Sequence, residues 1–177
     1  MMTLVTGGSG SGKSEFAENR TLTYSRENLV YVATMVAFDE EAHQKIARHR
    51  KMRQDKNFTT RECYVDLKSL ELNKEDTVLL DCMSNLVANE MYQENGAHEQ
   101  TVKQVIEGVA SMREQVNNLV IVTNEVFSDG IIYDNETSRY MSYLGTINKT
   151  LAKMADEVIE VVYTIPIYHK GREEKRC

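Results

Sequence analysis

The stretch Thr3-Leu4-Val5-Thr6-Gly7-Gly8-Ser9-Gly10-Ser11-Gly12-Lys13-Ser14 decides the fold class of this chain. Its first four residues are the apolar and β-branched types that form short buried strands. Its last eight match the pattern Gly-x4-Gly-Lys-Ser/Thr at every fixed position, directly before a segment of helical period. The stretch therefore predicts a phosphate-binding loop, the P-loop, at the start of an α/β domain.

Each residue type in the loop has a chemical reason to be there. Glycines let the backbone curl so that successive N–H groups point at phosphate oxygens, and the following helix adds its positive N-terminal end. Lys13 would place an ammonium group on the β- and γ-phosphates, and the Ser14 hydroxyl is a hard oxygen ligand for Mg²⁺. The alternative, a glycine-rich turn that binds nothing, is disfavoured by the complete motif. We expect nucleotide contacts from the whole loop: Gly7, Gly8, Ser9, Gly10, Ser11, Gly12, Lys13 and Ser14.

The rest of the chain alternates short apolar runs with longer segments of helical period, the pattern of a parallel sheet covered by helices. The predicted strands are Thr3–Thr6, Leu29–Thr34, Thr77–Asp81, Leu119–Thr123 and Glu157–Tyr163, with Cys63–Leu67 as a candidate for one more. The predicted helices are Lys13–Tyr24, Asp39–Gln54, Met83–Glu94, Glu99–Asn118 and Glu136–Ala155. At 177 residues we expect one P-loop nucleotide-binding domain over positions 1–177.

Composition narrows the function further. The net charge is −6, from 27 acids and 21 bases, whereas nucleic-acid binders usually carry a basic face, so nucleic acid is not expected as a main partner. The three cysteines, Cys63, Cys82 and Cys177, are odd in number and share no metal-ligand spacing, which favours free thiols in a reducing compartment. The opening residues show no pattern that predicts a signal peptide, and the sequence has no apolar run of about 18 residues. We expect a cytoplasmic protein without a membrane span.

Two strand ends carry acids suited to the nucleotide site. The apolar run Val78-Leu79-Leu80 ends in Asp81, the form taken by the carboxylate that holds Mg²⁺ in P-loop proteins. Glu125 follows another predicted strand, and such positions line the ligand crevice of open parallel sheets. Many buried strands simply end in an acid, so a structural role remains the alternative for both.

The predicted second helix contains a histidine in a basic run, Lys45-Ile46-Ala47-Arg48-His49-Arg50-Lys51-Met52-Arg53. Neighbouring guanidinium groups lower the pKa of an imidazole, and a neutral imidazole can attack phosphorus. The simpler interpretation is a solvated basic helix end that complements the helix dipole. The residues alone favour this simpler interpretation.

Several separate segments together resemble one family, the adenosylcobinamide kinase / adenosylcobinamide-phosphate guanylyltransferase family. The similarity spans nearly the whole chain, from residue 2 to about residue 165. The segments that carry it, beside the P-loop with Ala17-Glu18, are Tyr31-Val32-Ala33-Thr34, Asp39 through Arg53, Glu62-Cys63, Leu79-Leu80-Asp81-Cys82, Val122 through Val126, and Gly145 through Val158.

The resemblance implies a RecA-like P-loop NTPase fold and two reactions in cobalamin biosynthesis. In the first, ATP or GTP phosphorylates the hydroxyl of adenosylcobinamide. In the second, GMP from GTP passes through a guanylyl-histidine at His49 to the new phosphate, giving adenosylcobinamide-GDP. The resemblance also implies Mg²⁺ held by Ser14 and Asp81, and a homo-oligomer, expected to be a trimer. Further nucleotide contacts are expected from Ala33, Thr34, Met35, Arg50, Lys51, Met52, Arg53, Glu62 and Asp81.

The sequence also departs from the family pattern. Gly10 stands where the family loop commonly has arginine, Asp81 replaces a more usual glutamate, and residues 127–133 are poorer in glycine and lack a usual proline. These departures leave open a plain small-molecule kinase in which His49 is structural. A RecA-like nucleotide switch or nucleic-acid motor is a second alternative, which the acidic balance disfavours.

Overall fold

The computed structural model describes residues 1–37 and 39–171. In the second helix it also leaves aside the side chains of Glu41, Ala42, Lys45, His49 and Met52. Within the described residues, no helix combines the length and apolar character needed to cross a membrane.

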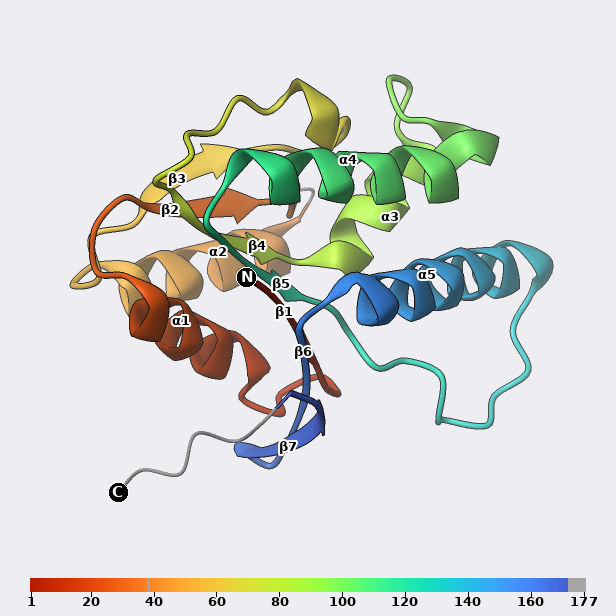
Figure 1. Cartoon of the computed structure of the whole chain (residues 1–177). Helices are drawn as coiled ribbons and strands as arrows, with labels where there is room; N and C mark the ends of the chain where they lie inside the picture. Colours follow the sequence, from red (N-terminus) through yellow and green to blue (C-terminus); the bar gives the residue numbers. More distant parts are fainter. Residues whose placement is uncertain (38, 172–177) are drawn as a thin grey trace.

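A seven-stranded sheet in the order β3-β2-β4-β5-β1-β6-β7 runs through the described residues (Figure 1). All neighbouring strands are parallel except β6 and β7. The strands are β1 (Met2–Thr6), β2 (Leu29–Ala33), β3 (Thr59–Glu62), β4 (Thr77–Asp81), β5 (Asn118–Val122), β6 (Glu157–Val162) and β7 (Ile165–Lys170). The four central strands β2, β4, β5 and β1 are rich in Val, Leu and Ile, since both of their faces are covered.

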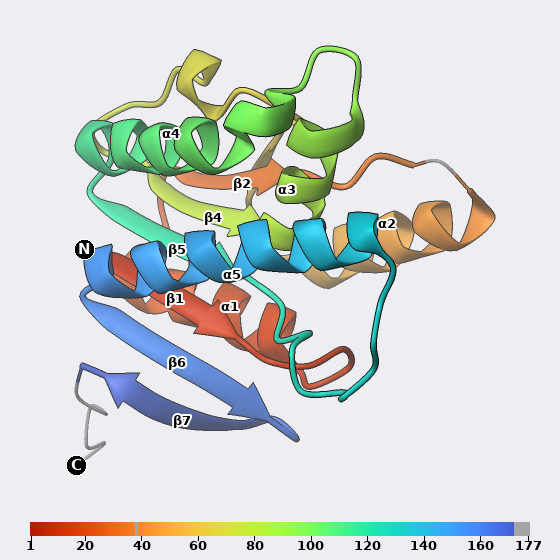
Figure 2. The same cartoon turned by 90° about the vertical axis from the view of Figure 1, so that its right-hand side faces the viewer.

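Helices cover both faces of the sheet (Figures 1 and 2). One face holds α1 (Lys13–Tyr24) and α2 (Glu40–Arg53), and the other holds α3 (Met83–Tyr92), α4 (Thr101–Gln115) and α5 (Asn135–Met154). The larger buried core lies under α3, α4 and α5, where Leu86, Val109 and Ile147 are fully buried. A smaller core lies under α1 and includes Ala17, Tyr31 and Val120.

This architecture confirms the predicted mostly parallel sheet flanked by helices. All five predicted strands and all five predicted helices are present, with ends that differ by a few residues. The predicted strand Cys63–Leu67 is wrong, because the extra strand is β3, directly before it. Every residue of β3 is exposed, so it pairs with β2 at the sheet edge without an apolar pattern. Cys63 and Leu67, which suggested a strand, are buried individually in the larger core.

Strand β7 lies outside the predicted elements. It forms a hairpin with β6 through Tyr163 and Thr164, which have φ values of 48° and 68°. Such turns usually carry Asn-Gly or Asp-Gly, and this pair gives no such signal. The hairpin supports the P-loop, because the Thr164 N–H donates a hydrogen bond of 2.8 Å to the Ser11 carbonyl oxygen.

The strand register brings predicted site residues into one row. Glu62 on β3 pairs with Ala33 on β2, Ala33 pairs with Asp81 on β4, and Asp81 pairs with Val122 on β5. Since these strands are parallel, their carboxyl ends meet at one edge of the sheet, where open α/β sheets bind ligands.

Candidate nucleotide-binding site

The P-loop has the backbone that its glycines allow. Gly10 and Gly12 have φ values of 72° and 90°, in the left-handed region that favours glycine. Gly12 directly precedes α1, so the loop delivers the positive end of a helix to the site. The Lys13 side chain is buried, and its Nζ donates a 3.0 Å hydrogen bond to the Gly8 carbonyl oxygen across the loop. The loop therefore has the backbone conformation that the P-loop pattern predicts.

One loop hydroxyl is buried without a hydrogen bond. The Ser11 Oγ atom has no partner among the described residues, although buried hydroxyls are normally paired. A Cβ atom on Gly7 would lie 2.7 Å from this oxygen and 2.5 Å from the Val161 carbonyl oxygen. Glycine at position 7 thus lets the loop pass close to β6.

A cavity of about 470 Å³ opens beside the P-loop. It is lined by Ser9, Gly10, Gly12, Lys13, Ser14, Glu15, Met35, Arg48, Asp81, Cys82, Asn85, Asn124, Glu125 and Val126. Ser14, Asp81 and Glu125, all predicted from the sequence, face this one space. The Glu125 carboxylate also accepts hydrogen bonds from the Phe127 N–H and the Ser128 hydroxyl.

The residues of this cavity fit Mg²⁺. No cluster of three or more His, Cys, Asp or Glu that could hold a metal occurs in the described part of the chain. Mg²⁺ in phosphate sites, however, is commonly held by one or two protein oxygens together with phosphate oxygens and water. Ser14 and Asp81, which both line the loop cavity, would supply such oxygens.

Asp81 is held from two directions. The Tyr31 hydroxyl donates a 3.0 Å hydrogen bond to its Oδ2 atom. Behind it, the Thr34 hydroxyl donates to the Cys82 carbonyl oxygen and accepts from the Cys82 N–H, each at 2.8 Å. Burial and the Asp81 charge raise the pKa of Tyr31 above its usual value, so the phenol stays protonated as a donor.

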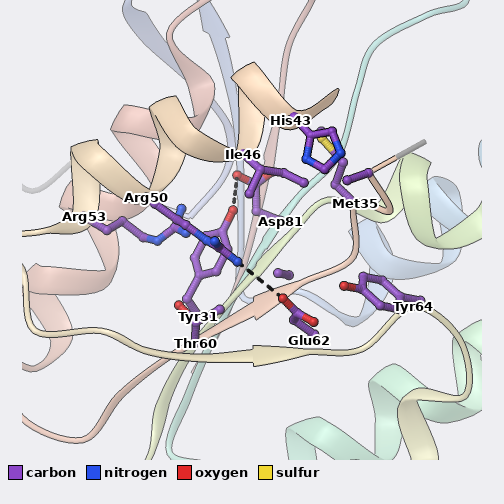
Figure 3. Close-up of a pocket in the computed structure, with 12 residues that line it drawn as sticks. Tyr31, Met35, His43, Ile46, Arg50, Arg53, Thr60, Glu62, Tyr64 and Asp81 are labelled. Carbon is purple, nitrogen blue, oxygen red and sulfur yellow. Dashed lines mark hydrogen bonds and ion pairs between the residues drawn. The ribbon is translucent and has the colours of Figure 1, made fainter. Parts of the chain in front are cut away.

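A second cavity, of about 220 Å³, lies between α2 and the carboxyl ends of β2 and β3 (Figure 3). It is lined by Tyr31, Ala33, Met35, Ala37, His43, Ile46, Arg50, Arg53, Thr60, Glu62, Tyr64 and Asp81. It therefore brings together six of the residues predicted for nucleotide binding: Ala33, Met35, Arg50, Arg53, Glu62 and Asp81. Met35 and Asp81 line both cavities, so the two spaces adjoin.

The polar residues of the second cavity differ in exposure. Arg50 Nη2 lies 3.5 Å from Glu62 Oε1, and both side chains are more than half exposed, so the pair is weak. Arg53 is 7% exposed and lies against Tyr31. Thr34 is fully buried, and its hydroxyl is used within the protein.

The remaining predicted residues have different placements. Lys51 is exposed and is not among the residues that line either cavity. The side chains of His49 and Met52 lie outside the described part of the structure, although both positions belong to α2. Position 49 falls between Arg48, which lines the P-loop cavity, and Arg50, which lines the second cavity.

Several cavity residues were absent from the sequence-based prediction. In the sequence, Arg48 stands out only as part of a basic run, and Tyr31 only as part of a segment that resembles the family. His43, Thr60 and Tyr64 carried no signal, because they reach the second cavity through the fold of α2 and the pairing of β3 with β2. The register of β2, β3 and β4 is the information that would have found them.

Fold and site together define a P-loop nucleotide-binding protein of the RecA-like kind, in which β5 separates the loop strand β1 from the acid-bearing strand β4. Residues 3–168 match the family described as cobinamide kinase / cobinamide phosphate guanyltransferase. The chain belongs to this family, whose name covers a kinase and a guanylyltransferase reaction of cobalamin biosynthesis.

Curated relatives agree with this assignment. The chain is 33% identical to the bifunctional adenosylcobalamin biosynthesis protein CobU of Salmonella typhimurium, over 94% of this chain and 98% of that protein. It is 32% identical to the protein of the same name from Escherichia coli, with the same coverage. The bifunctional adenosylcobalamin biosynthesis protein CobP of Pseudomonas aeruginosa is 25% identical, over 97% of this chain and 98% of that protein.

Proposed function

We propose that this chain carries out both reactions of its family on adenosylcobinamide, with GTP bound in the P-loop and His49 as the residue that carries GMP. The observation that supports the proposal is the adjoining pair of cavities, which share Asp81 and Met35 and are both lined by α2. Triphosphate in the loop cavity would extend the rest of the nucleotide toward the second one. Position 49 lies on the helix segment that borders both.

In the kinase reaction, the hydroxyl of adenosylcobinamide attacks the γ-phosphorus of ATP or GTP and loses its proton. The bond between the γ-phosphorus and its bridging oxygen breaks, and the nucleoside diphosphate leaves. Lys13 and the loop N–H groups stabilise the charge that develops on the β- and γ-phosphates.

In the transferase reaction, a neutral His49 imidazole nitrogen attacks the α-phosphorus of GTP. A P–N bond forms, the bond from the α-phosphorus to its bridging oxygen breaks, and pyrophosphate leaves into the P-loop. A phosphate oxygen of adenosylcobinamide phosphate then attacks the same phosphorus and frees the imidazole, giving adenosylcobinamide-GDP. Arg50, exposed at the rim of the second cavity, is suited to hold the guanylyl phosphate.

Mg²⁺, held by Ser14 and Asp81, would neutralise phosphate charge in both reactions. We also propose a homo-oligomer, with a trimer expected from the family resemblance, and no nucleic-acid partner. A cytoplasmic location agrees with the free, buried thiols of Cys63 and Cys82.

The test is incubation of the protein with GTP labelled at either the α- or the γ-phosphate. The proposal predicts acid-labile, base-stable protein label from α-labelled GTP only, and its loss in His49→Ala. Adenosylcobinamide should chase the label into adenosylcobinamide-GDP after phosphorylation. Label that persists in His49→Ala would refute the role of this histidine, and γ-label transfer to adenosylcobinamide without any α-label would leave a plain kinase.

A further inference from the structure

Among the described side chains of helix α2, the one buried against the protein body belongs to its last residue. Among the α2 side chains that the structure describes, those of His43, Gln44, Ala47, Arg48, Arg50 and Lys51 are exposed, Ile46 is half-buried, and only Arg53 is buried. Surface helices normally seat on a stripe of apolar side chains. Among the described α2 side chains the buried one is instead a charged residue, so the contacts of Arg53 contribute to where the helix lies.

Arg53 is held from two sides. Its guanidinium carbon lies 3.3 Å from the centre of the Tyr31 ring, a close cation–π stack (Figure 3). Its Nη1 atom lies 3.9 Å from Oε1 of Glu18, which is 1% exposed on α1. This ion pair is longer than a hydrogen bond, and neither of the two atoms has a hydrogen-bond partner among the described residues. The other Glu18 oxygen accepts a 2.6 Å hydrogen bond from Lys56, just beyond α2. The end of α2 is thus tied to the helix that follows the P-loop.

The Arg53–Tyr31 stack is connected to the loop cavity through the Tyr31 hydroxyl. The Tyr31 ring under Arg53 carries the hydroxyl that donates to Asp81 Oδ2 at 3.0 Å. A shift of Arg53 would move or release this ring, and with it the donor that orients the carboxylate. Tyr31 is 4% exposed and packs edge-on against Phe58 at 6.4 Å, so it has little room to move independently.

We infer that Arg53 and Tyr31 are positioning residues that couple the seating of α2 to the orientation of Asp81. Arg53, which the resemblance suggested as a nucleotide contact, acts through its neighbours. The inference deepens the proposed function, because it links the helix that carries His49 to the acid proposed for Mg²⁺. Nucleotide and Mg²⁺ bound at Asp81 would favour the seated helix, and the seated helix would favour their binding.

The chain contains a matched control for this arrangement. The Tyr24 hydroxyl donates a 2.8 Å hydrogen bond to Glu157, and the Arg20 guanidinium lies 4.9 Å from the Tyr24 ring centre. This second set of arginine, tyrosine and carboxylate lines neither cavity. Tyr24→Phe therefore removes the same kind of hydrogen bond without touching the site.

The experiment compares Tyr31→Phe, Arg53→Lys, their double variant and Tyr24→Phe by two measurements that need no turnover. The first is amide hydrogen exchange of residues 40–53. The second is the gain in affinity for a fluorescent GTP analogue when EDTA is replaced by Mg²⁺. Lysine keeps the charge of Arg53 and loses the planar stack, so the fold is preserved while the seat is weakened.

We expect Arg53→Lys to speed exchange in α2 about tenfold with β4 and β5 unchanged, since the planar stack of the guanidinium on the Tyr31 ring is lost. Tyr31→Phe should cut the Mg²⁺-dependent gain about tenfold, as expected for a lost hydrogen bond to a charged group. Arg53→Lys should cut this gain too, and the double variant should be little worse than either single one. Tyr24→Phe should change neither measurement.

Two results would overturn the inference. One is faster exchange in Arg53→Lys with an unchanged Mg²⁺-dependent gain, because the seat would then not reach Asp81. The other is a loss of the Mg²⁺-dependent gain in affinity in Tyr24→Phe that equals the loss in Tyr31→Phe. Failure of the proposed function is a separate outcome, since absence of the α-label on His49 would leave the exchange and binding results standing.

Discussion

Arg48 is the residue whose role the cavity geometry predicts most directly. It belongs to α2 and lines the P-loop cavity together with Gly10 and Lys13. The loop itself has glycine at position 10, where the family resemblance leads us to expect an arginine. We therefore predict that Arg48 supplies the second phosphate-binding cation of this site and that Arg48→Ala weakens GTP binding.

The size of the effect follows from exposure and charge. A hydrogen bond between charged groups contributes about 1.5–3 kcal/mol. Arg48 is exposed, so solvent screening lowers the expected loss to about 1–2 kcal/mol, around and below the lower end of this range. That loss corresponds to a dissociation constant raised about 5- to 30-fold.

The assay is equilibrium titration with a fluorescent GTP analogue at two salt concentrations, with Arg113→Ala as the control. Arg113 is a similarly exposed helix arginine that pairs with Asp156, far from both cavities. A second check places an arginine on the loop itself, as Gly10→Arg in the Arg48→Ala background. A Cβ atom at position 10 would meet no atom within 4 Å, so this double variant should recover part of the affinity for the GTP analogue. The recovery should be incomplete, because the φ of 72° at Gly10 strains any other residue by about 1 kcal/mol. Equal affinities of Arg48→Ala and Arg113→Ala would refute the reasoning.

Three further outcomes are expected. Glu157→Gln should lower the free energy of unfolding by about 3 kcal/mol, because it leaves the buried Arg20 without its partner, and urea denaturation at pH 7 measures this. Burial raises the pKa of Glu157, but hydrogen bonds led by Arg20 outweigh it and hold the pKa below its usual value. The difference in the free energy of unfolding between Glu157→Gln and wild type should therefore be present above about pH 4.5 and shrink as the pH falls through the folded-state pKa of Glu157. A difference that stays constant down to about pH 3 would contradict this prediction. Gly12→Ala places a Cβ atom 3.0 Å from the Thr164 methyl group, at a residue with a φ of 90°. GTP titration should therefore show at least about tenfold weaker binding, while the free energy of unfolding falls by only about 1–2 kcal/mol. Asp81→Asn should bind the GTP analogue in EDTA nearly as wild type does and lose the gain from Mg²⁺, and a retained gain would exclude Asp81 as a ligand.

The sequence was informative where one segment carries its own signal. The P-loop pattern, the buried strands β1, β2, β4 and β5 and the polar strand ends could all be predicted, because burial on both faces requires continuous apolar runs. Strand β3 could not, since all its residues are exposed and only pairing with β2 makes it a strand. The β6–β7 hairpin was hidden for another reason, namely that Tyr163 adopts a positive φ without a glycine or asparagine signal.

In the site, too, some residues could be predicted from the sequence and others could not. Lys13, Ser14, Asp81 and Glu125 were predicted from local context, and the fold brings all four to the loop cavity. The burial of Arg53 could not be predicted, because nothing near it in the sequence explains why an arginine in a basic run should be inside. Its partners lie on other elements, with Glu18 on α1 and Tyr31 on β2. Contacts between residues so far apart exist only in the assembled fold.

The arrangement of α2 explains why its seating matters for chemistry. Successive residues of an α-helix point about 100° apart, so the side chains of Arg48 and Arg50 leave the helix in nearly opposite directions. Since Arg48 lines the loop cavity and Arg50 lines the second cavity, the helix lies along the boundary between the two cavities. Most of the α2 side chains that the structure describes are exposed, and these form no broad apolar stripe. Among these side chains, the buried Arg53 between Glu18 and Tyr31 attaches the end of the helix to the protein body. The same attachment ends at Asp81, so the helix that would carry the guanylyl group and the acid that would hold Mg²⁺ are positioned by one set of contacts.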